Sequence, residues 1–371
     1  MLQLPDYPWN QLAPYRELAA QYPGGVVDLS IGTPIDDTPQ IIQDALASAA
    51  NSHGYPTTHG TTEVRQAIVD WFARRRNVTG LGLDDVMPTV GSKEMVAWLP
   101  LFLGLGAGDI VVRPKIAYPT YDIGAQLVGA TPVATDDLSE LTDEQLAKVK
   151  LIWVNSPGNP TGKVRDVQDL ADIVRQAREL GAVVASDECY AELGWDDVRG
   201  HVPSILDPRV NGGNLDNLFA LYSLSKQSNL AGYRAAFIAG APNLMPELVN
   251  SRKHTGMIVP GPIQHAMVVA LGDEEHVRVQ YDIYRARREA LAPALRNFGL
   301  QIDDSVAGLY LWCTEQRPSF ETIQRLAELG IVAGPGVFYG TAGEQHVRIA
   351  LTASDERIAA AVERLNSSVN R

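Results

Sequence analysis

The sequence predicts an α/β protein built on a mostly parallel sheet, followed by a smaller α+β region. Short runs rich in β-branched and aromatic residues alternate with segments whose apolar residues recur at helical spacing, as in parallel sheets with crossover helices. From about Asp273 the pattern changes to one long charged segment, residues 273–299, and then to short strand-like runs and a last helix. We therefore expect a large domain over residues 45–272 and a small domain formed by residues 1–44 and 273–371.

The elements of the large domain follow in order. Helices are predicted at residues 39–50, PQIIQDALASAA, and 61–76, TTEVRQAIVDWFARRR. The longest apolar run, at 95–108, is broken by proline and glycine and is too short to cross a bilayer, so we predict a buried helix. Buried strands are predicted at 109–114, 151–155, 182–188, 218–225 and 235–240, with a helix at 168–181. Ligands of such sheets lie beyond the carboxyl ends of the strands.

Charge and cysteine content narrow the range of partners. The 371 residues carry 31 Lys and Arg against 44 Asp and Glu, and the net charge of −13 opposes extended contact with nucleic acid. The cysteines Cys189 and Cys313 lie in apolar runs without metal spacing, which indicates reduced thiols in a cytoplasmic protein. The first residues lack the basic and apolar regions of a secretion signal, so neither export nor membrane binding is expected.

Several familiar motifs fail on spacing. GLGAGD at 104–109 has the wrong glycine spacing for a dinucleotide site, and GNPTGKV at 158–164 is one residue short of a phosphate loop. The histidines form no metal-binding pair, and the sequence contains no G-x-S-x-G motif. The sequence therefore indicates neither a metal site nor a serine hydrolase.

Polar residues next to the predicted strands are the remaining candidates for chemistry. Asp187 follows the run VVAS, Asn159 lies in WVNSPGNPTG, and Lys226 lies in ALYSLSK. Gly91 and Ser92 begin a helix in TVGSKE. Each of these residues alone also fits a cap or a turn. Together they supply an amine for an aldehyde, a carboxylate for a ring nitrogen and a helix N-terminus for a phosphate, as pyridoxal 5′-phosphate requires.

The motifs around these residues resemble one enzyme family. YSLSKQSNLAGYR, residues 222–234, resembles the lysine signature of the fold-type I, class I/II pyridoxal-phosphate-dependent aminotransferases. SPGNPTG, SDECY, YPTTHGTTEVR, AYPTY and HVRIAL are similar to further blocks of that family. DLSIGTP, GSKEMVAWLP, SDECYAELGW and RKHTGMIVP resemble the N-succinyldiaminopimelate aminotransferases in particular. The resemblance implies a three-layer large domain, a smaller α+β domain, and a homodimer with its active site at the subunit interface.

The resemblance also implies a catalytic set. Lys226 would bond the cofactor through its amine and then act as the general base that moves the proton of the substrate Cα. Asp187 would keep the pyridine nitrogen protonated, so that the ring accepts electrons. Tyr190 and Asn159 would hydrogen-bond the oxygen on the cofactor ring and tune its protonation.

The cofactor phosphate would be bound by groups from two segments. These are the backbone amides around Gly91 and Ser92, the hydroxyls of Ser223 and Ser225, and the guanidinium of Arg234.

Three further residues are candidates for cofactor contacts. Lys93 follows the phosphate turn, with a solvent-facing charge as the favoured interpretation. Tyr118, in AYPTY, would stack on the cofactor ring and border the substrate, although an aromatic residue at such a turn also fits ordinary packing. Tyr55 would reach the phosphate of the neighbouring subunit, which would make the dimer necessary for activity.

The substrate would be bound from both ends of the chain. By resemblance, Arg348 in HVRIAL would clamp the α-carboxylate with a fork of hydrogen bonds, and the backbone of Gly32 would approach the same group. Asn159 would also border the substrate, with a cis peptide before Pro160. Ligand contacts from both ends would allow the small domain to close during turnover.

The implied reaction moves an amino group from glutamate to a dicarboxylic keto acid, with N-succinyl-2-amino-6-oxopimelate as the expected acceptor. Its extra carboxylates call for cations beyond Arg348, and Arg252 and Lys253 are the candidates, although basic residues on an exposed helix are common. Three alternatives remain open. These are an aminotransferase for aspartate, aromatic or alanine substrates, a pyridoxal-phosphate-dependent carbon–sulfur lyase, and a regulator that senses the cofactor, for which a basic DNA-binding extension is missing before Leu29.

Overall fold

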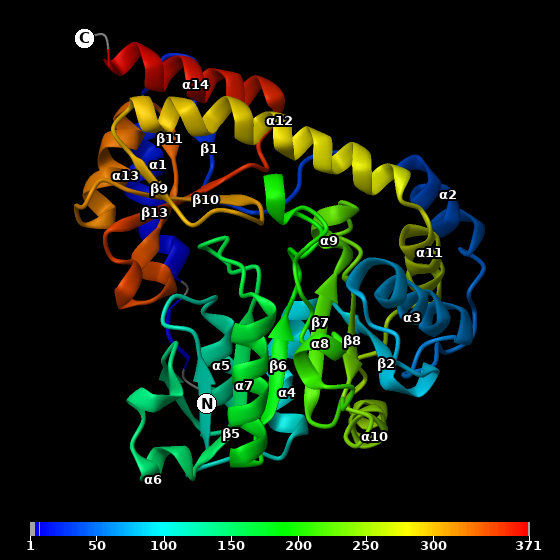
Figure 1. The fold of residues 1–371 in the computed structure, drawn as a ribbon. Helices are drawn as coiled ribbons and strands as arrows, with labels where there is room; N and C mark the ends of the chain where they lie inside the picture. Colours follow the sequence, from blue (N-terminus) through cyan, green and yellow to red (C-terminus); the bar gives the residue numbers. More distant parts are fainter. Residues whose placement is uncertain (1–3, 7, 370–371) are drawn as a thin grey trace.

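A computed structural model describes residues 4–6 and 8–369 (Figure 1). Its α-helices are α1 (Ala13–Ala19), α2 (Gln40–Ser48), α3 (Thr62–Arg76), α4 (Ser92–Phe102), α5 (Thr120–Leu127), α6 (Asp143–Leu146), α7 (Val167–Leu180), α8 (Pro208–Asn211), α9 (Leu224–Gln227), α10 (Met245–Thr255), α11 (Gly261–Gly272), α12 (Glu275–Asn297), α13 (Ser319–Glu328) and α14 (Asp355–Val369). Short 3-10 helices are η1 (Pro8–Leu12), η2 (Leu83–Asp85), η3 (Leu138–Glu140), η4 (Asp196–Val198), η5 (Gly336–Tyr339) and η6 (Thr341–Gly343).

The strands are β1 (Val27–Asp28), β2 (Val86–Val90), β3 (Ile110–Arg113), β4 (Thr131–Ala134), β5 (Val149–Asn155), β6 (Val183–Asp187), β7 (Leu218–Ser223), β8 (Ala235–Gly240), β9 (Gln301–Asp303), β10 (Tyr310–Thr314), β11 (Ile331–Val332), β12 (Gly334–Pro335) and β13 (His346–Ala350). Within the described residues, seven of them form the large sheet in the order β2-β8-β7-β6-β5-β3-β4. All neighbours in it are parallel except β8, which runs antiparallel to β2 and β7.

The antiparallel strand β8 follows from a short connection. Only the one-turn helix α9 and a loop lie between the end of β7 at Ser223 and the start of β8 at Ala235. A parallel crossover needs a dozen or more residues and usually a full helix, so this connection favours the opposite direction. The predicted fold class, a mostly parallel α/β sheet with a smaller α+β region, is confirmed.

The large sheet is covered on both faces, and successive side chains along a central strand point alternately into two hydrophobic cores. Ile152 and Val154 of β5 face a core shared with α3, α7 and α11, whereas Leu151 and Trp153 face a core shared with α4, α5 and α10. This alternation explains why the strands read as continuous apolar runs in the sequence. Figure 1 shows helices α4 and α7 on opposite sides of the strands.

The second region combines the two ends of the chain. Four antiparallel strands in the order β12-β13-β10-β9 form its sheet, and β1 pairs in parallel with β11. Helices α12 and α14 pack against each other above this sheet in the view of Figure 1. The predicted division of the chain at residues 44/45 and 272/273 stays a prediction, and its first point falls within α2, which packs on α11.

The described residues show neither a membrane-spanning helix nor a cluster of metal ligands. None of the helices there has the length and apolar character that a membrane crossing requires. In the same part of the chain, no cluster of three or more His, Cys, Asp or Glu side chains could hold a metal ion.

Candidate active site

A cavity of about 520 Å³ lies beyond the carboxyl ends of the central strands, between the large sheet and the small one. Asp187 ends β6 beside Asn155 at the end of β5, because residues in register on parallel strands end at the same edge. The cavity brings together most of the predicted site residues: Gly32, Ser92, Lys93, Tyr118, Asn159, Asp187, Tyr190, Ser223, Ser225, Lys226, Arg234 and Arg348.

Lys226 lies in the short helix α9, directly after β7. Its Nζ donates a hydrogen bond to the carbonyl oxygen of Gly32, almost two hundred residues away in the sequence. Burial lowers the pKa of the amine, and the positive charges of Arg348 and Arg234 lower it further. A lowered pKa increases the fraction of the unprotonated amine, which is the form that attacks a carbonyl carbon.

Asp187 is buried at the floor of the cavity. Its Oδ2 accepts a hydrogen bond from the Tyr121 hydroxyl at 3.0 Å, and its Oδ1 accepts one from the backbone N–H of Cys189 at 3.2 Å. Burial raises the pKa of the Asp187 carboxyl, although these two hydrogen bonds oppose the rise. A cation brought next to this carboxylate would relieve the cost of its burial, as a protonated ring nitrogen does.

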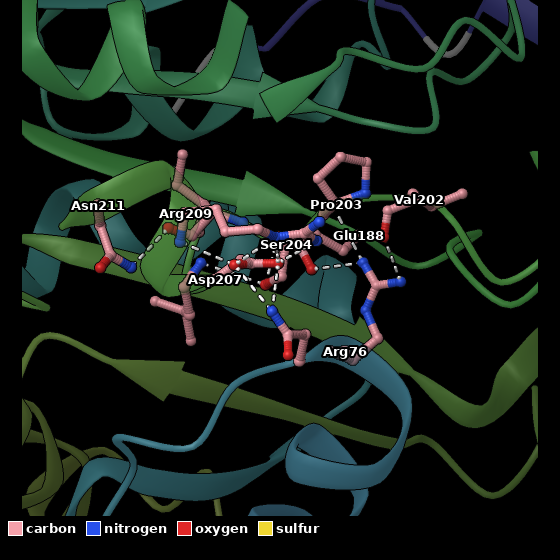
Figure 2. Close-up of polar contacts among 11 residues, drawn as sticks. Arg76, Glu188, Val202, Pro203, Ser204, Asp207, Arg209 and Asn211 are labelled. Carbon is pink, nitrogen blue, oxygen red and sulfur yellow. Dashed lines mark hydrogen bonds and ion pairs between the residues drawn. The ribbon is translucent and has the colours of Figure 1, made fainter. Parts of the chain in front are cut away.

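The turn that follows Asp187 is anchored by a buried polar network, drawn in Figure 2. Glu188 and Arg76 form an ion pair at 3.1 Å with both side chains only 2% exposed. Arg76 also donates to the carbonyl oxygens of Val202 and Pro203, and Glu188 Oε1 accepts from the hydroxyl of Ser204. Through these bonds the network holds the segment that carries Asp187 and Tyr190 to helix α3.

The predicted phosphate site is shaped by a glycine. Gly91 has a φ of +75° and precedes Ser92, which is the first residue of α4 and lines the cavity, so the helix N-terminus with its free backbone N–H groups lies at the cavity wall. A Cβ on residue 91 would lie 2.0 Å from Nη2 of Arg234, so a side chain there would displace the guanidinium. The hydroxyls of Ser223 and Ser225 lie 2.8 Å apart at the end of β7. These groups form a cradle of donors for an anion.

Lys93 and Tyr118 lie on the same side of the cavity. Both line it, and the Lys93 ammonium is 5.8 Å from the centre of the Tyr118 ring. Lys93 is also exposed, which agrees with the favoured interpretation of a solvent-facing charge, while its ammonium lies over the Tyr118 ring at the cavity wall.

Arg348 is held from three directions. Its Nη1 donates to Oδ1 of Asn159 at 3.0 Å and its Nη2 donates to the carbonyl oxygen of Ser30 at 2.7 Å. Its guanidinium carbon lies 4.0 Å from the centre of the Tyr310 ring. The side chain is buried, yet its Nε finds no hydrogen-bond partner among the described residues. Because Arg348 also lines the cavity, a ligand carboxylate there would supply an acceptor for its guanidinium.

Asn159 is oriented by a residue that the sequence reasoning did not single out. Asn155 Oδ1 accepts from the backbone N–H of Asn159 at 2.7 Å, and Asn155 Nδ2 donates to the carbonyl oxygen of Asp187 at 3.0 Å. The peptide bonds before Pro157 and Pro160 are both cis, so the expected cis peptide at Pro160 is confirmed.

Three predicted residues lie away from the cavity. Arg252 is fully buried, where its guanidinium pairs with Glu94 and donates to the carbonyl oxygen of Met257, so the expectation that it lines the substrate pocket is wrong for this structure. Lys253, its neighbour on α10, is exposed and does not line the cavity either. Tyr55 is fully exposed in the single chain, and its predicted contact with a neighbouring subunit stays a prediction.

Comparison with known proteins assigns the family. Residues 24–365 match the family model described as aminotransferase class I and II. The chain belongs to this family. Its members depend on pyridoxal phosphate, so the recognition from the lysine signature and the expected cofactor are both confirmed.

Relatives of this aminotransferase carry several names. It is 50% identical over 365 residues to 4-dedimethylamino-4-oxo-anhydrotetracycline transaminase OxyQ of Streptomyces rimosus, covering 98% of this chain and 100% of the relative. It is 34% identical to LL-diaminopimelate aminotransferase of Aquifex aeolicus, covering 98% of this chain and 97% of the relative. A solved structure described as a probable N-succinyldiaminopimelate aminotransferase from Thermus thermophilus has a TM-score of 0.87 and 27% identity, covering 98% of this chain and 100% of the other.

The aminotransferase cavity fits pyridoxal phosphate on its own geometry. The amine of Lys226, the buried carboxylate of Asp187 and the anion cradle at Gly91 and Arg234 correspond to the aldehyde, ring nitrogen and phosphate of that cofactor.

Sequence reasoning missed Tyr121 and Tyr310. Tyr310 also lines the cavity, with its hydroxyl 3.2 Å from that of Tyr190. Neither tyrosine lies in a polar turn after a strand, which was the signal that identified the other candidates.

Proposed function

We propose that this aminotransferase moves the amino group of glutamate to a keto acid that carries further carboxylates, with N-succinyl-2-amino-6-oxopimelate as the acceptor. The observation that carries this proposal is the buried Arg348, whose Nε lacks a partner among the described residues while its other nitrogens are fixed by Asn159 and Ser30. A carboxylate is the acceptor that best matches a desolvated guanidinium. The named acceptor is supported by the motifs shared with N-succinyldiaminopimelate aminotransferases and by the related Thermus structure.

Each site residue has a task in this reaction. Arg348 binds the α-carboxylate and thereby sets the substrate Cα near the Lys226 amine. Lys226 Nζ removes the proton from Cα, which its lowered pKa favours because the amine is more readily unprotonated. Asp187 stabilises a positive charge on the ring nitrogen, and Tyr121 holds its carboxylate in place. Pyridoxal phosphate, when bound, supplies the electron-accepting ring that this chemistry needs.

Arg16 replaces Arg252 and Lys253 as the candidate for a distal carboxylate. It lies on α1, lines the cavity and donates from Nη2 to Asp28 at 3.1 Å and to the Ser30 hydroxyl at 3.2 Å. Its side chain is 36% exposed, so its remaining N–H donors are accessible to a ligand. The N-terminal segment would thus contribute to substrate choice.

A second acceptor is favoured by the relative from Streptomyces rimosus. Identity of 50% across its full length is higher than that to the diaminopimelate aminotransferase from Aquifex aeolicus. The cavity also has apolar walls, with Trp9 and Ile31 beside Arg16, which suit a larger ring system. The alternative acceptor is therefore a polycyclic ketone of the anhydrotetracycline type.

We also propose a cytoplasmic homodimer in which Tyr55 completes the phosphate site of the neighbouring subunit. The support is its full exposure in the single chain, which is unusual for a tyrosine and is relieved by an interface. Tyr55→Phe should bind pyridoxal phosphate more weakly than the wild type, because the phosphate loses one hydrogen bond. Light scattering should show that the variant is still a dimer.

The test is a comparison of amino acceptors on the purified holoenzyme. The first measurement is the decrease in the visible absorbance of the bound cofactor after glutamate is added, which reports the first half of the reaction. The second measures restoration of that absorbance by N-succinyl-2-amino-6-oxopimelate, oxaloacetate, an aromatic keto acid, pyruvate and a 4-oxo-anhydrotetracycline. Restoration by the first compound at the lowest concentration supports the proposal. Restoration only by the last supports the second candidate, and pyruvate and ammonia released from cystathionine without any acceptor would indicate a lyase instead.

A further inference from the structure

Tyr310 lines the cavity and contacts residues from both sides of it. It is the first residue of β10 and is 3% exposed. Its hydroxyl is 3.2 Å from the hydroxyl of Tyr190, and its ring faces the guanidinium of Arg348 at 4.0 Å. One side chain therefore touches two residues to which the proposed reaction gives separate tasks.

The stacking of Tyr310 on Arg348 follows from strand register. Trp312 of β10 lies directly opposite Arg348 of β13, and Tyr310 lies opposite Ala350. Since side chains two residues apart share a face of a sheet, Tyr310 and Arg348 are diagonal neighbours on the same face. The ring presents its electron-rich face to the buried cation, which stabilises the charge and fixes the plane of the guanidinium.

The hydroxyl of Tyr310 acts on a different neighbour. It shares a hydrogen bond with the hydroxyl of Tyr190, while the two rings meet edge to face at 5.7 Å. Burial acts to raise the pKa of Tyr310, but the positive charges of Arg348 and Lys226 outweigh it and lower that pKa. Lys226 and Arg348 are thus the charged groups that act on this hydroxyl, which shares its hydrogen bond with Tyr190 and in which either oxygen can be the donor.

The position of Tyr310 also explains the glycine at residue 32. A Cβ on residue 32 would lie 1.9 Å from the Tyr310 hydroxyl and 2.7 Å from the ring carbon that carries it. The backbone of Gly32 can therefore approach, and its carbonyl oxygen accepts the hydrogen bond from Lys226. Tyr310 is packed against the segment that holds the catalytic amine.

We propose that Tyr310 is a positioning residue with two separable parts, a ring that orients Arg348 for the substrate carboxylate and a hydroxyl that orients Tyr190 for the oxygen of the cofactor ring. The inference rests on the tasks that the proposed function gives to Arg348 and Tyr190. It extends that function, because one side chain then orients both Arg348, which binds the substrate carboxylate, and Tyr190, which binds the oxygen of the cofactor ring.

The experiment compares Tyr310→Phe, which keeps the ring, with Tyr310→Met, which replaces it by a flexible apolar side chain that fills part of the space. Tyr281→Phe is the matched control, because this buried tyrosine also loses one hydrogen bond, to the carbonyl oxygen of Gly194, outside the cavity. Two quantities are measured on each holoenzyme. They are the midpoint of the pH titration of the bound cofactor's visible absorbance, and the dissociation constant of succinate, which carries carboxylates but cannot react.

The two variants are expected to differ in a defined way. Tyr310→Phe moves the titration midpoint upward by about 0.5 pH unit, because Tyr190 loses the partner that orients its hydroxyl and then stabilises the oxygen of the cofactor ring less well. It leaves succinate affinity unchanged within about twofold, because the ring remains over Arg348. Tyr310→Met shows the same shift and also weakens succinate binding about tenfold. Tyr281→Phe matches the wild type in both measurements.

Each part of the inference can fail separately. A wild-type midpoint in Tyr310→Phe would overturn the role of the hydroxyl. Succinate binding in Tyr310→Met as tight as in Tyr310→Phe would overturn the role of the ring, and Tyr310→Leu provides a second ringless variant if the methionine variant does not fold. Equal shifts in Tyr281→Phe would show a merely structural effect. A wild-type holoenzyme that does not bind succinate would refute the carboxylate role of Arg348 in the proposed function itself, which is a different result from any of these.

Discussion

Replacing Arg348 by lysine should separate recognition of the substrate carboxylate from the stability of the fold. The guanidinium uses one donor for Asn159 and one for the carbonyl oxygen of Ser30, and its geometry leaves further N–H groups for a carboxylate. Lysine keeps the positive charge but loses the planar fork, so it cannot make both fixing contacts and a two-point contact to the substrate. The loss of one charge-assisted hydrogen bond is worth about 1.5–3 kcal/mol, which corresponds to about 10- to 150-fold in kcat/KM.

The assay is steady-state transamination with glutamate, with Arg364→Lys as the control. Arg364 is also buried and also lies over a tyrosine ring, at 4.5 Å from that of Tyr22, while it donates to the carbonyl oxygens of Gly25 and Gly330 away from the cavity. We expect both variants to lose some thermal stability, but only Arg348→Lys to lose kcat/KM. If Arg348→Lys retained wild-type kcat/KM for glutamate, the carboxylate would be bound elsewhere and the reasoning from the unpartnered Nε would be refuted.

Three further predictions concern the cofactor and its supports. Lys226→Ala should abolish turnover. Borohydride reduction of the wild-type holoenzyme should attach the cofactor permanently and increase the protein mass, and the variant should show no such increase. If the variant kept the increase, another lysine would carry the covalent bond. Asp187→Asn should raise the melting temperature of the cofactor-free protein at pH 7 by about 2 °C while it abolishes turnover. Burial raises the pKa of Asp187 above its unfolded value of 3.8. The stability that this carboxyl contributes is therefore present below pH 3.8 and is lost as pH rises through the folded pKa. The gain in melting temperature from Asp187→Asn should accordingly vanish at low pH. Glu188→Gln should lower the free energy of unfolding by about 3–5 kcal/mol in urea, because it leaves Arg76 buried without its counter-charge, whereas Glu144→Gln at an exposed ion pair should leave the midpoint unchanged.

Much of the site was predictable because parallel strands end at one edge. Asp187 and Lys226 each follow a continuous apolar run, and Asn159 follows such a run by four residues, so the sequence places all three at the same edge of the sheet. The spacing of the serines around Lys226 then indicates a phosphate next to the amine. This argument needs only the local pattern and the direction of the strands.

The same argument could not find Tyr310 or Tyr121. Tyr121 lies inside α5 and Tyr310 begins a strand of the other sheet, and both read as ordinary core aromatics. Their hydroxyls are functional only because a second segment brings a partner, Asp187 for Tyr121 and Tyr190 for Tyr310. Pairings between segments this far apart have no signature in either segment alone.

The prediction that Arg252 lines the substrate pocket is wrong, although helical spacing indicates its buried position. Leu248 and Val249 precede it by four and three residues and are both buried, so all three share the inner face of α10. A charged residue on a buried face requires a partner, and Glu94 at the start of α4 provides it. The basic run SRKHT suggested an exposed, charged surface. The helical spacing of Arg252 from Leu248 and Val249 instead indicates that its side chain points into the core.

Three of the contacts that bridge the cavity are made by site residues. Lys226 donates to Gly32, Arg348 donates to Asn159, and Tyr190 shares a hydrogen bond with Tyr310. A carbonyl carbon at Lys226 would compete for the amine that donates to Gly32, and a substrate carboxylate would add an acceptor beside the Arg348 guanidinium that donates to Asn159. Substrate binding would therefore act on contacts that bridge the cavity, next to backbone hydrogen bonds such as that from Trp195 N–H to the carbonyl oxygen of Val306, and we expect it to promote closure of the small domain during turnover. On this reasoning, succinate should change the protection of the β10 and β13 amides from hydrogen exchange in the wild type and not in Arg348→Lys, and equal changes in both proteins would contradict the coupling.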